Sequence, residues 1–375
     1  MTFTFSEEQS LLRDAARSFM IDRAAVSRFR KMRDERKNGR DPDLWREMVE
    51  LGWSGIIVPE QFGGVGLGYV GLGLVLEEAG RKLVSSPLLS TALIGTSAIL
   101  LGGNDTQKST WLPRLVNGNA LAALAVDETA HHAPDRVIVA ATNTGHVYSL
   151  SGQKRFVADG HIADLIIVPA RASGNLGDAK GVALFLVQGD AKGLTRQELV
   201  TVDSRGAADM VFDNVPAEPL GDPAIGSQLL EQILDRGRIG LAAEMLGQAA
   251  EEFEIIGEYL KTRRQFGQLI GGFQALQHRA ARMFTDIELT RSCVIAALDA
   301  LDRNADNIPE WSSLAKARAS DTLHLVPNET VQMLGGIGMT DAHDAGLYLK
   351  RARVAEGLYG GSSFHRDRYA RLLGF

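Results

Sequence analysis

The chain has 375 residues, of which 45% are hydrophobic and 23% are charged, the proportions of an ordinary globular protein. Its 40 basic and 46 acidic residues give a formal net charge of −6, whereas a general nucleic-acid binder would carry a basic excess. The single cysteine, Cys293, excludes an internal disulfide and a cysteine-rich metal site.

We expect no targeting or membrane-spanning segment in this sequence. Its start, MTFTFSEEQ, lacks the basic and apolar regions of a secretory signal. Apolar runs such as Ala92–Gly103 are shorter than the roughly 18 residues that a membrane-spanning helix needs. We therefore expect a soluble, cytoplasmic protein with no membrane partner and no nucleic-acid partner.

Residues 1–118 have the pattern of an all-α domain. Ser6 and Gln9 fit a capping box that opens a helix over Glu7–Met20. Glycine- and proline-containing turns separate the helices that we expect next. These lie near Leu44–Leu51, Gly71–Ala79, Leu88–Leu101 and Gln107–Val116.

Residues 119–222 predict an antiparallel β domain, because short aliphatic runs alternate with turn residues about every ten positions. The expected strands are Ala122–Val126, Arg136–Ala141, Val147–Leu150, Ala163–Pro169, Gly181–Val187 and Met210–Val215. Leu165–Val168 and Ala183–Val187 are continuously apolar, which predicts strands that are buried on both faces.

Residues 223–375 return to a helical pattern. Apolar residues recur every three or four positions over Leu246–Leu260 and Leu276–Leu301, and a third helix is expected over Ser312–Leu325. On the first of these helices, Glu251, Glu252, Glu254 and Glu258 are expected to face solvent. Stripes of this length predict a C-terminal four-helix bundle. The expected fold class is therefore α+β, with an all-α domain, a β domain and a bundle in chain order.

Three short motifs suggest other functions but lack the necessary context. Gly66–Gly71 matches a dinucleotide-binding fingerprint, yet no acidic residue follows about 20 positions later. His365–Asp367 matches a kinase triplet without the other kinase motifs, and we expect a solvated C-terminal helix there. His131 and His132 have no carboxylate cluster at metal-ligand spacing beside them. We expect no metal site.

Three separated segments resemble the acyl-CoA dehydrogenase family. They are YLKTRRQFGQLIGGFQALQHRAARM at Tyr259–Met283, QMLGGIGMT at Gln332–Thr340 and VPEQFGGVGLG at Val58–Gly68. The resemblance covers essentially the whole chain, including the helix–sheet–helix order. It implies the fold of these flavoenzymes, FAD as the cofactor and desaturation of an acyl-CoA thioester at its α and β carbons.

The resemblance implies two sets of flavin contacts. One set is expected to reach across a dimer interface into the partner's site, and it consists of Arg263, Phe266, Gln274, Gln332, Gly335 and Gly336. An arginine fork suits a pyrophosphate, and glycines let backbone approach a bulky ligand. The other set lies in the chain's own site, where Phe156 and Ala158 replace a stretch whose hydroxyl contacts the flavin. The G-S-D part of a further flavin- and substrate-contacting loop is missing from Leu124–His132.

The carboxylate base of the family has no counterpart at either position where the resemblance predicts it. The C-terminal position falls at Gly360, or at Tyr359 if one residue is skipped, and the alternative position is Gly237. Such a base removes the α-proton of the substrate, and general-base help is worth about 10²–10⁴-fold.

Glu356 is the carboxylate nearest to the empty position. It is either a relocated base or a partner of Arg351 or Arg353 across a helical turn. Arg238 is expected either near the substrate thioester or in a salt bridge.

These observations leave three readings of the function. The first is a base-lacking subunit that pairs with a competent homologue in a heteromer, acting by analogy on bulky CoA thioesters of the steroid side-chain type. The second is a self-sufficient homotetrameric dehydrogenase that uses Glu356. The third is a CoA-thioester-binding or scaffold protein without flavin. An electron-transfer flavoprotein is the expected electron acceptor for the first two.

Overall fold

The computed structural model describes residues 5–37, 39, 41–143, 145, 147–178 and 180–375. The chain divides into two compact units, which we describe separately. The bundle unit consists of Met1–Arg30, Tyr69–Val84 and Arg238–Phe375, and the sheet unit consists of Lys31–Gly68 and Ser85–Gly237. The domain boundaries expected after residues 118 and 222 remain a prediction.

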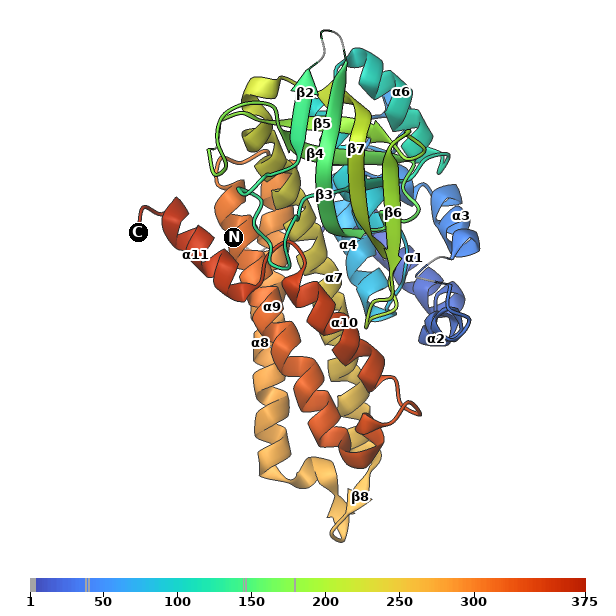
Figure 1. The fold of residues 1–375 in the computed structure, drawn as a ribbon. Coiled ribbons are helices and arrows are strands. Elements are labelled where there is room, and N and C mark those ends of the chain that lie inside the picture. Colours follow the sequence, from blue (N-terminus) through green and yellow to red (C-terminus); the bar gives the residue numbers. More distant parts are fainter. Residues whose placement is uncertain (1–4, 38, 40, 144, 146, 179) are drawn as a thin grey trace. The chain divides into compact units, whose positions relative to one another are not determined.

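Seven strands of the sheet unit form one sheet (Figure 1). They are β1 (Ala122–Leu124), β2 (Ala140–Asn143), β3 (Tyr148–Ala158), β4 (Leu165–Arg171), β5 (Val182–Gln188), β6 (Leu194–Leu199) and β7 (Ala207–Leu220). Because β5 pairs with both β4 and β7, the strands β4-β2-β3-β7-β5 close into a barrel. Most pairings are antiparallel, as expected, but β1 and β2 run parallel to β4.

The barrel confirms the prediction that the two continuously apolar runs form strands buried on both faces. Leu165–Ala170 of β4 and Val182–Val187 of β5 are buried throughout, since the barrel interior covers one face of the strands and other elements cover the second. Three details differ from expectation. The strand over Arg136–Ala141 begins only at Ala140, β3 and β7 extend well beyond the predicted runs, and β6 was not predicted because its sequence is largely polar.

The helices of the sheet unit include α3 (Pro42–Glu50), α5 (Thr96–Gly102) and α6 (Asp105–Val116). The single helix expected over Leu88–Leu101 is instead a π-helix, Leu88–Gly95, followed by α5. Every residue of the π-helix is buried. Thr91 links it to β1, because its hydroxyl donates to the Ala122 carbonyl and accepts from the Ala122 amide.

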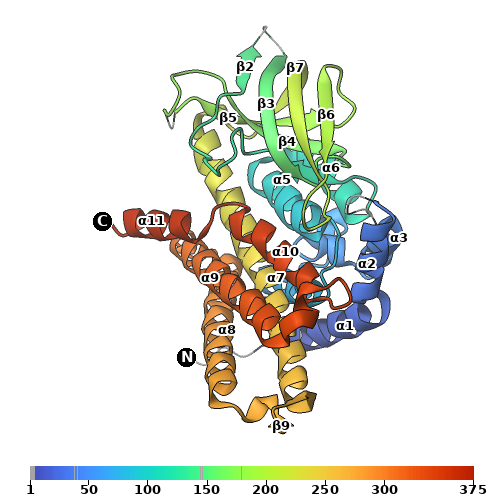
Figure 2. The same ribbon diagram turned by 60° about the horizontal axis from the view of Figure 1, so that its bottom comes forward.

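The bundle unit is made of long helices (Figures 1 and 2). Its helices are α1 (Glu7–Arg23), α8 (Gln274–Asp302), α9 (Ile308–Leu334), α10 (Ala345–Gly357) and α11 (Ser362–Leu372), with α4 (Gly68–Arg81) from Tyr69 onward and α7 (Gly226–Thr262) from Arg238 onward. The predicted capping box of Ser6 and Gln9 is present. An additional helix, α2 (Val26–Asp34), lies in a charged segment where no helix was predicted, and its residues up to Arg30 belong to this unit.

The interior of the bundle unit contains polar groups as well as apolar ones. A Cβ on Gly247 of α7 would overlap the Glu77 carbonyl of α4, so these two helix backbones touch. Arg351 of α10 donates to the Glu244 carboxylate of α7 at 2.5 Å. Glu252 is fully buried, so the prediction that it faces solvent was wrong. Packing of α7 against neighbouring helices, which the local pattern does not reveal, covers this position.

The expected α+β fold class, with helices, a β domain and a helical bundle in that order, is confirmed. Within the described residues, no helix has both the length and the apolar character of a membrane span.

Candidate functional site

A tight hairpin carries two of the residues predicted to contact a flavin. It follows α7 and pairs β8 (Arg264–Gln265) with β9 (Gln268–Leu269). Phe266 and Gly267 both have positive φ, at 53° and 79°, as a two-residue hairpin turn requires. The Phe266 side chain is 89% exposed and contacts Phe273 edge-on, with ring centroids 6.1 Å apart. A large aromatic held outward on a rigid turn is suited to contact another molecule.

Arg263 lies at the base of this hairpin with its guanidinium group exposed. Its backbone amide donates to the Tyr259 carbonyl and its own carbonyl accepts from Ile270, so the backbone is fixed. Among the described residues, the guanidinium group has no hydrogen-bond or ion-pair partner. It is therefore available to an external anion.

The other predicted contacts lie at the start of α8 and at the end of α9. Gln274 and Gln332 are exposed, and their side-chain amide groups have no hydrogen-bond partner among the described residues. Gly335 has φ 69°, and a Cβ on either Gly335 or Gly336 would meet no atom within 4 Å. Tyr259, one turn before Arg263, donates to the Leu334 carbonyl at 3.4 Å, which ties the hairpin and the glycine pair to the same end of the bundle.

The position expected for the carboxylate base is a strained loop after α10. Tyr359 is buried with φ 57°, and Gly360 has φ 104°. A Cβ on Gly360 would lie 2.5 Å from Cδ1 of Phe364 and 3.0 Å from Nε2 of His365. A side chain at position 360 therefore fits only if the loop or Phe364 moves. The other expected position, Gly237, is buried within α7.

Glu356, the alternative base, is bound to cationic and imidazole groups of the bundle surface. Its Oε1 accepts from Nη1 of Arg353 at 2.8 Å, and its Oε2 lies 3.2 Å from Nδ1 of His324. Arg351 instead pairs with Glu244. Of the two arginines that the sequence offered as partners, Glu356 therefore pairs with Arg353, which is exposed.

Arg238 is fully buried and faces the same loop. Its Nε donates to the Tyr359 carbonyl at 3.3 Å, and its guanidinium carbon lies 5.6 Å from the centre of the Phe364 ring. A cation over an aromatic face is a stabilising arrangement. In the described chain this arginine supports the loop backbone.

Two further polar residues contact this loop, and neither was predicted from the sequence to lie there. Lys316 of α9 is fully buried and donates to the carbonyls of Ala355, Glu356 and Gly360. His365 of α11 is also buried, with Nε2 3.1 Å from the Tyr359 carbonyl. It was expected on a solvated helix, and that expectation is wrong for this residue because its side chain turns toward the loop. No local signal marks Lys316, since its partners lie about forty positions away in the sequence.

In the sheet unit, Phe156 and Ala158 lie near the end of β3, next to an irregularity in its pairing with β7. Phe156 has φ 48° and its side chain is 40% exposed. Its amide donates to Oδ1 of Asp209 at 2.8 Å, which stabilises the unusual backbone. Positive φ at an aromatic residue is costly and tends to occur at functional positions. Ala158 offers no side-chain hydrogen bond there.

The loop between β1 and β2 is closed by a histidine–carboxylate contact. Nδ1 of His132 lies 2.9 Å from Oδ1 of Asp127, and the Ala133 amide also points to this carboxylate. No cluster of three metal-ligating side chains occurs within the described residues. This contact holds the loop in which the expected G-S-D sequence is missing.

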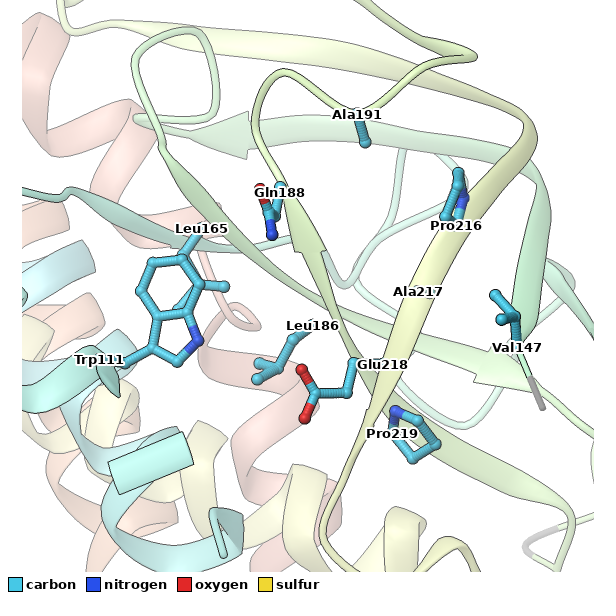
Figure 3. Close-up of a pocket in the computed structure, with 10 residues that line it drawn as sticks. All are labelled: Trp111, Val147, Leu165, Leu186, Gln188, Ala191, Pro216, Ala217, Glu218 and Pro219. Carbon is cyan, nitrogen blue, oxygen red and sulfur yellow. The ribbon is translucent and has the colours of Figure 1, made fainter. Parts of the chain in front are cut away.

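Two cavities of the sheet unit are lined by other residues. One, of about 470 Å³, opens where β5 and β7 separate after the pair Leu186 and Glu218. Figure 3 shows Trp111 of α6 on one side of it, with Gln188 and Glu218 reaching toward the opening. Another, of about 590 Å³, is bordered by α3. Neither lining includes a residue that the sequence predicts to contact flavin or substrate.

Comparison with known proteins identifies the family. Models described as "Acyl-CoA dehydrogenase" match three segments: the N-terminal domain at residues 6–119, the middle domain at 131–215 and the C-terminal domain at 226–374. The probable acyl-CoA dehydrogenase YngJ of Bacillus subtilis is 30% identical, covering 100% of both chains. An acyl-CoA dehydrogenase of the same species is 32% identical, covering 85% of this chain and 86% of the relative.

Solved structures agree with this result. Butyryl-CoA dehydrogenase from Megasphaera elsdenii superimposes with a TM-score of 0.92 at 26% identity, covering 100% of both chains. A variant of the Tcur3481–Tcur3483 steroid ACAD superimposes with a TM-score of 0.88 at 31% identity, covering 98% of both chains. The resemblance inferred from the sequence, and the oxidoreductase class that goes with it, are confirmed. The chain belongs to the acyl-CoA dehydrogenase family.

Proposed function

We propose that this chain is a subunit of an FAD-dependent acyl-CoA dehydrogenase that completes the flavin site of a homologous partner and lacks a catalytic base of its own. The observation that carries the proposal is a contrast between two groups of residues. The side chains of Arg263, Gln274 and Gln332, which are expected to contact a partner's flavin, are exposed and have no hydrogen-bond partner within the described residues. The loop expected to carry the base instead presents Tyr359 and Gly360.

The first group has the chemistry that a dinucleotide requires. The guanidinium group of Arg263 binds a pyrophosphate through paired, charge-assisted hydrogen bonds. The amides of Gln274 and Gln332 supply neutral donors and acceptors, and the open space before Gly335 and Gly336 admits a bulky ligand. The exposed ring of Phe266 supplies an apolar surface to the dinucleotide. These groups hold and orient FAD, which when bound accepts a hydride from the β-carbon of the thioester.

The second group lacks the acid–base chemistry of the reaction. Neither Gly360 nor Gly237 can remove the α-proton, and Ala158 offers no hydroxyl to a flavin. The carboxylate of Glu356 accepts a hydrogen bond from Arg353, which fixes its direction. Because a missing general base costs about 10²–10⁴-fold in rate, we expect negligible turnover at a site built by this chain alone.

The substrate class and partners belong to the same proposal. An acyl-CoA thioester is the substrate. The similarity to the Tcur3481–Tcur3483 steroid ACAD, whose name joins two components, favours a steroid-type acyl group. An electron-transfer flavoprotein is the proposed acceptor; a chain in the structure of the electron transferring flavoprotein of Acidaminococcus fermentans is 28% identical to this chain. The heteromer is a tetramer in the cytoplasm.

The test is purification of the chain alone and after co-expression with a homologue that carries the missing glutamate. We expect the chain alone to contain little flavin and to show no dehydrogenation of acyl-CoA substrates. The co-purified complex should be yellow and active. Full flavin occupancy and turnover of the chain alone would overturn the proposal.

Replacing Glu356 by glutamine distinguishes the self-sufficient alternative. If Glu356 were a relocated base, the chain alone would be active and the change would abolish that activity. Under our proposal, the heteromer carries the activity and the change should not lower it. The matched control is Glu258→Gln, which changes an exposed carboxylate of α7 that is paired with Lys261. A complex that stays colourless in every partner context would instead support a CoA-thioester-binding protein without flavin.

A further inference from the structure

The loop Leu358–Gly361, between α10 and α11, has a shape that excludes a side chain at one position. Two successive residues, Tyr359 and Gly360, have positive φ. A methyl group on the Gly360 α-carbon would overlap Cδ1 of Phe364 and would lie only 3.0 Å from Nε2 of His365. Positive φ at a buried tyrosine persists only when surrounding contacts enforce it. The contacts that enforce it come from three helices.

Lys316 of α9 links this loop to the end of α10. Its Nζ lies 3.1 Å from the carbonyls of Ala355 and Glu356, 3.0 Å from the Gly360 carbonyl and 3.2 Å from the Ser320 hydroxyl. The first two carbonyls belong to the last turn of α10, where helical acceptors are otherwise unpaired and a cation is favoured. One ammonium group thus joins the end of α10 to the far side of the loop.

Helices α7 and α11 contact the Tyr359 carbonyl, which lies between the end of α10 and Gly360. Nε of Arg238 and Nε2 of His365 both point to the Tyr359 carbonyl, at 3.3 and 3.1 Å. Beyond the loop, Asp321 accepts from the Ser362 hydroxyl at 2.7 Å and from Nη2 of Arg366. The loop backbone is therefore fixed from α7, α9 and α11.

The charges around Lys316 make its protonation responsive near neutral pH. Burial lowers the pKa of Lys316 to about 7; the Glu356 carboxylate opposes this shift and the Arg238 guanidinium adds to it. Burial and the charges of Arg238 and Lys316 lower the pKa of His365 to about 2, so this imidazole stays neutral. An ammonium group donates three hydrogen bonds and an amine donates two, so loss of the proton weakens the hold on the loop.

We propose that Lys316 is the positioning residue of this loop: its buried ammonium group fixes Leu358–Gly361 in the shape that leaves no room for a side chain at position 360. The functional meaning of this shape rests on the proposed function, because the loop is where the base of a competent subunit is expected. The loop shape thus agrees with the missing base, since a glutamate at position 360 would fit only if the loop or Phe364 moved.

A double-mutant cycle tests this proposal. Gly360→Ala is expected to lower the Tm of the full chain by several degrees, because the new methyl group overlaps Phe364. In a Lys316→Met background the loop can move, so at least half of that loss should disappear. The matched control is Lys350→Met, which removes an exposed lysine of α10 and should leave the effect of Gly360→Ala unchanged. Additive effects of Lys316→Met and Gly360→Ala would overturn the proposal.

Hydrogen exchange of the unaltered chain gives a second measurement if a variant fails to fold. After correction for intrinsic rates, protection of the Leu358–Gly361 amides should fall about fivefold or more between about pH 6 and about pH 9, with a midpoint near 7. Amides of α8 should not follow this titration. Equal protection of the loop across this range would contradict the proposal. Both experiments use the chain alone, so their failure is distinct from failure to form an active heteromer.

Discussion

Replacing Arg263 by alanine is expected to weaken flavin binding about 10- to 100-fold in the assembly that contains the cofactor. The guanidinium group is exposed and has no partner among the described residues, so its removal disturbs little within the chain itself. A hydrogen bond to a charged group contributes about 1.5–3 kcal/mol, which corresponds to this loss of affinity. The measurement is the flavin content of the co-purified complex, followed by titration of the apoprotein with FAD.

A control arginine separates this effect from a general loss of positive charge. Arg46 of α3 is similarly exposed and pairs with Asp43 on the same helix, so Arg46→Ala should leave flavin affinity unchanged. The expected defect should also appear when only this subunit is altered, because the proposal assigns Arg263 to a flavin held mainly by the partner. Normal flavin content in the Arg263→Ala complex would show that this arginine does not contact the cofactor.

Replacing Glu252 by methionine is expected to stabilise the bundle unit at neutral pH. The carboxyl group is fully buried, and neither of its oxygens has a hydrogen-bond partner within the described residues. Burial raises the pKa of Glu252 well above the ordinary 4.5. An unsatisfied buried polar group costs about 1–3 kcal/mol, and an apolar side chain of similar length removes that cost.

The pH dependence of this effect has a definite sign. Because the folded-state pKa is the higher one, folded Glu252 keeps its proton at pH values where the unfolded chain has lost it. The contribution of Glu252 to the stability of the unaltered chain therefore falls as pH rises above about 4.5, and the advantage of Glu252→Met should grow over the same range. Thermal unfolding at about pH 4 and about pH 7.5 measures the difference.

Glu258→Met provides the control for Glu252→Met on the same helix. Glu258 is exposed and pairs with Lys261, so its replacement should change the free energy of unfolding by only a few tenths of a kcal/mol. If Glu252→Met instead destabilises the protein at neutral pH, the carboxyl group has a stabilising partner, such as a buried water, and this account of Glu252 is wrong.

The order of the elements and the family could be derived from the sequence because both depend on local patterns. Capping residues, apolar periodicity and turn residues act within a few positions, so Ser6, the strands around Leu165–Val168 and the long stripes of α7 and α8 were recognisable. Elements with weak or polar patterns, such as α2 and β6, were not. Their formation depends on packing against the rest of their units.

The sequence by itself also supplied the predicted site residues and the positions at which a base is missing. It places Arg263, Gln274 and Gln332 in segments typical of the family, and it has glycines where a base is expected. Only the tertiary structure decided that Lys316, Arg238 and His365 converge on one loop, that Glu356 pairs with Arg353, and that Glu252 is buried. Lys316 and Gly360 are 44 positions apart. Their contact depends on how α9 packs against the end of α10, and no pattern within a single helix encodes that packing.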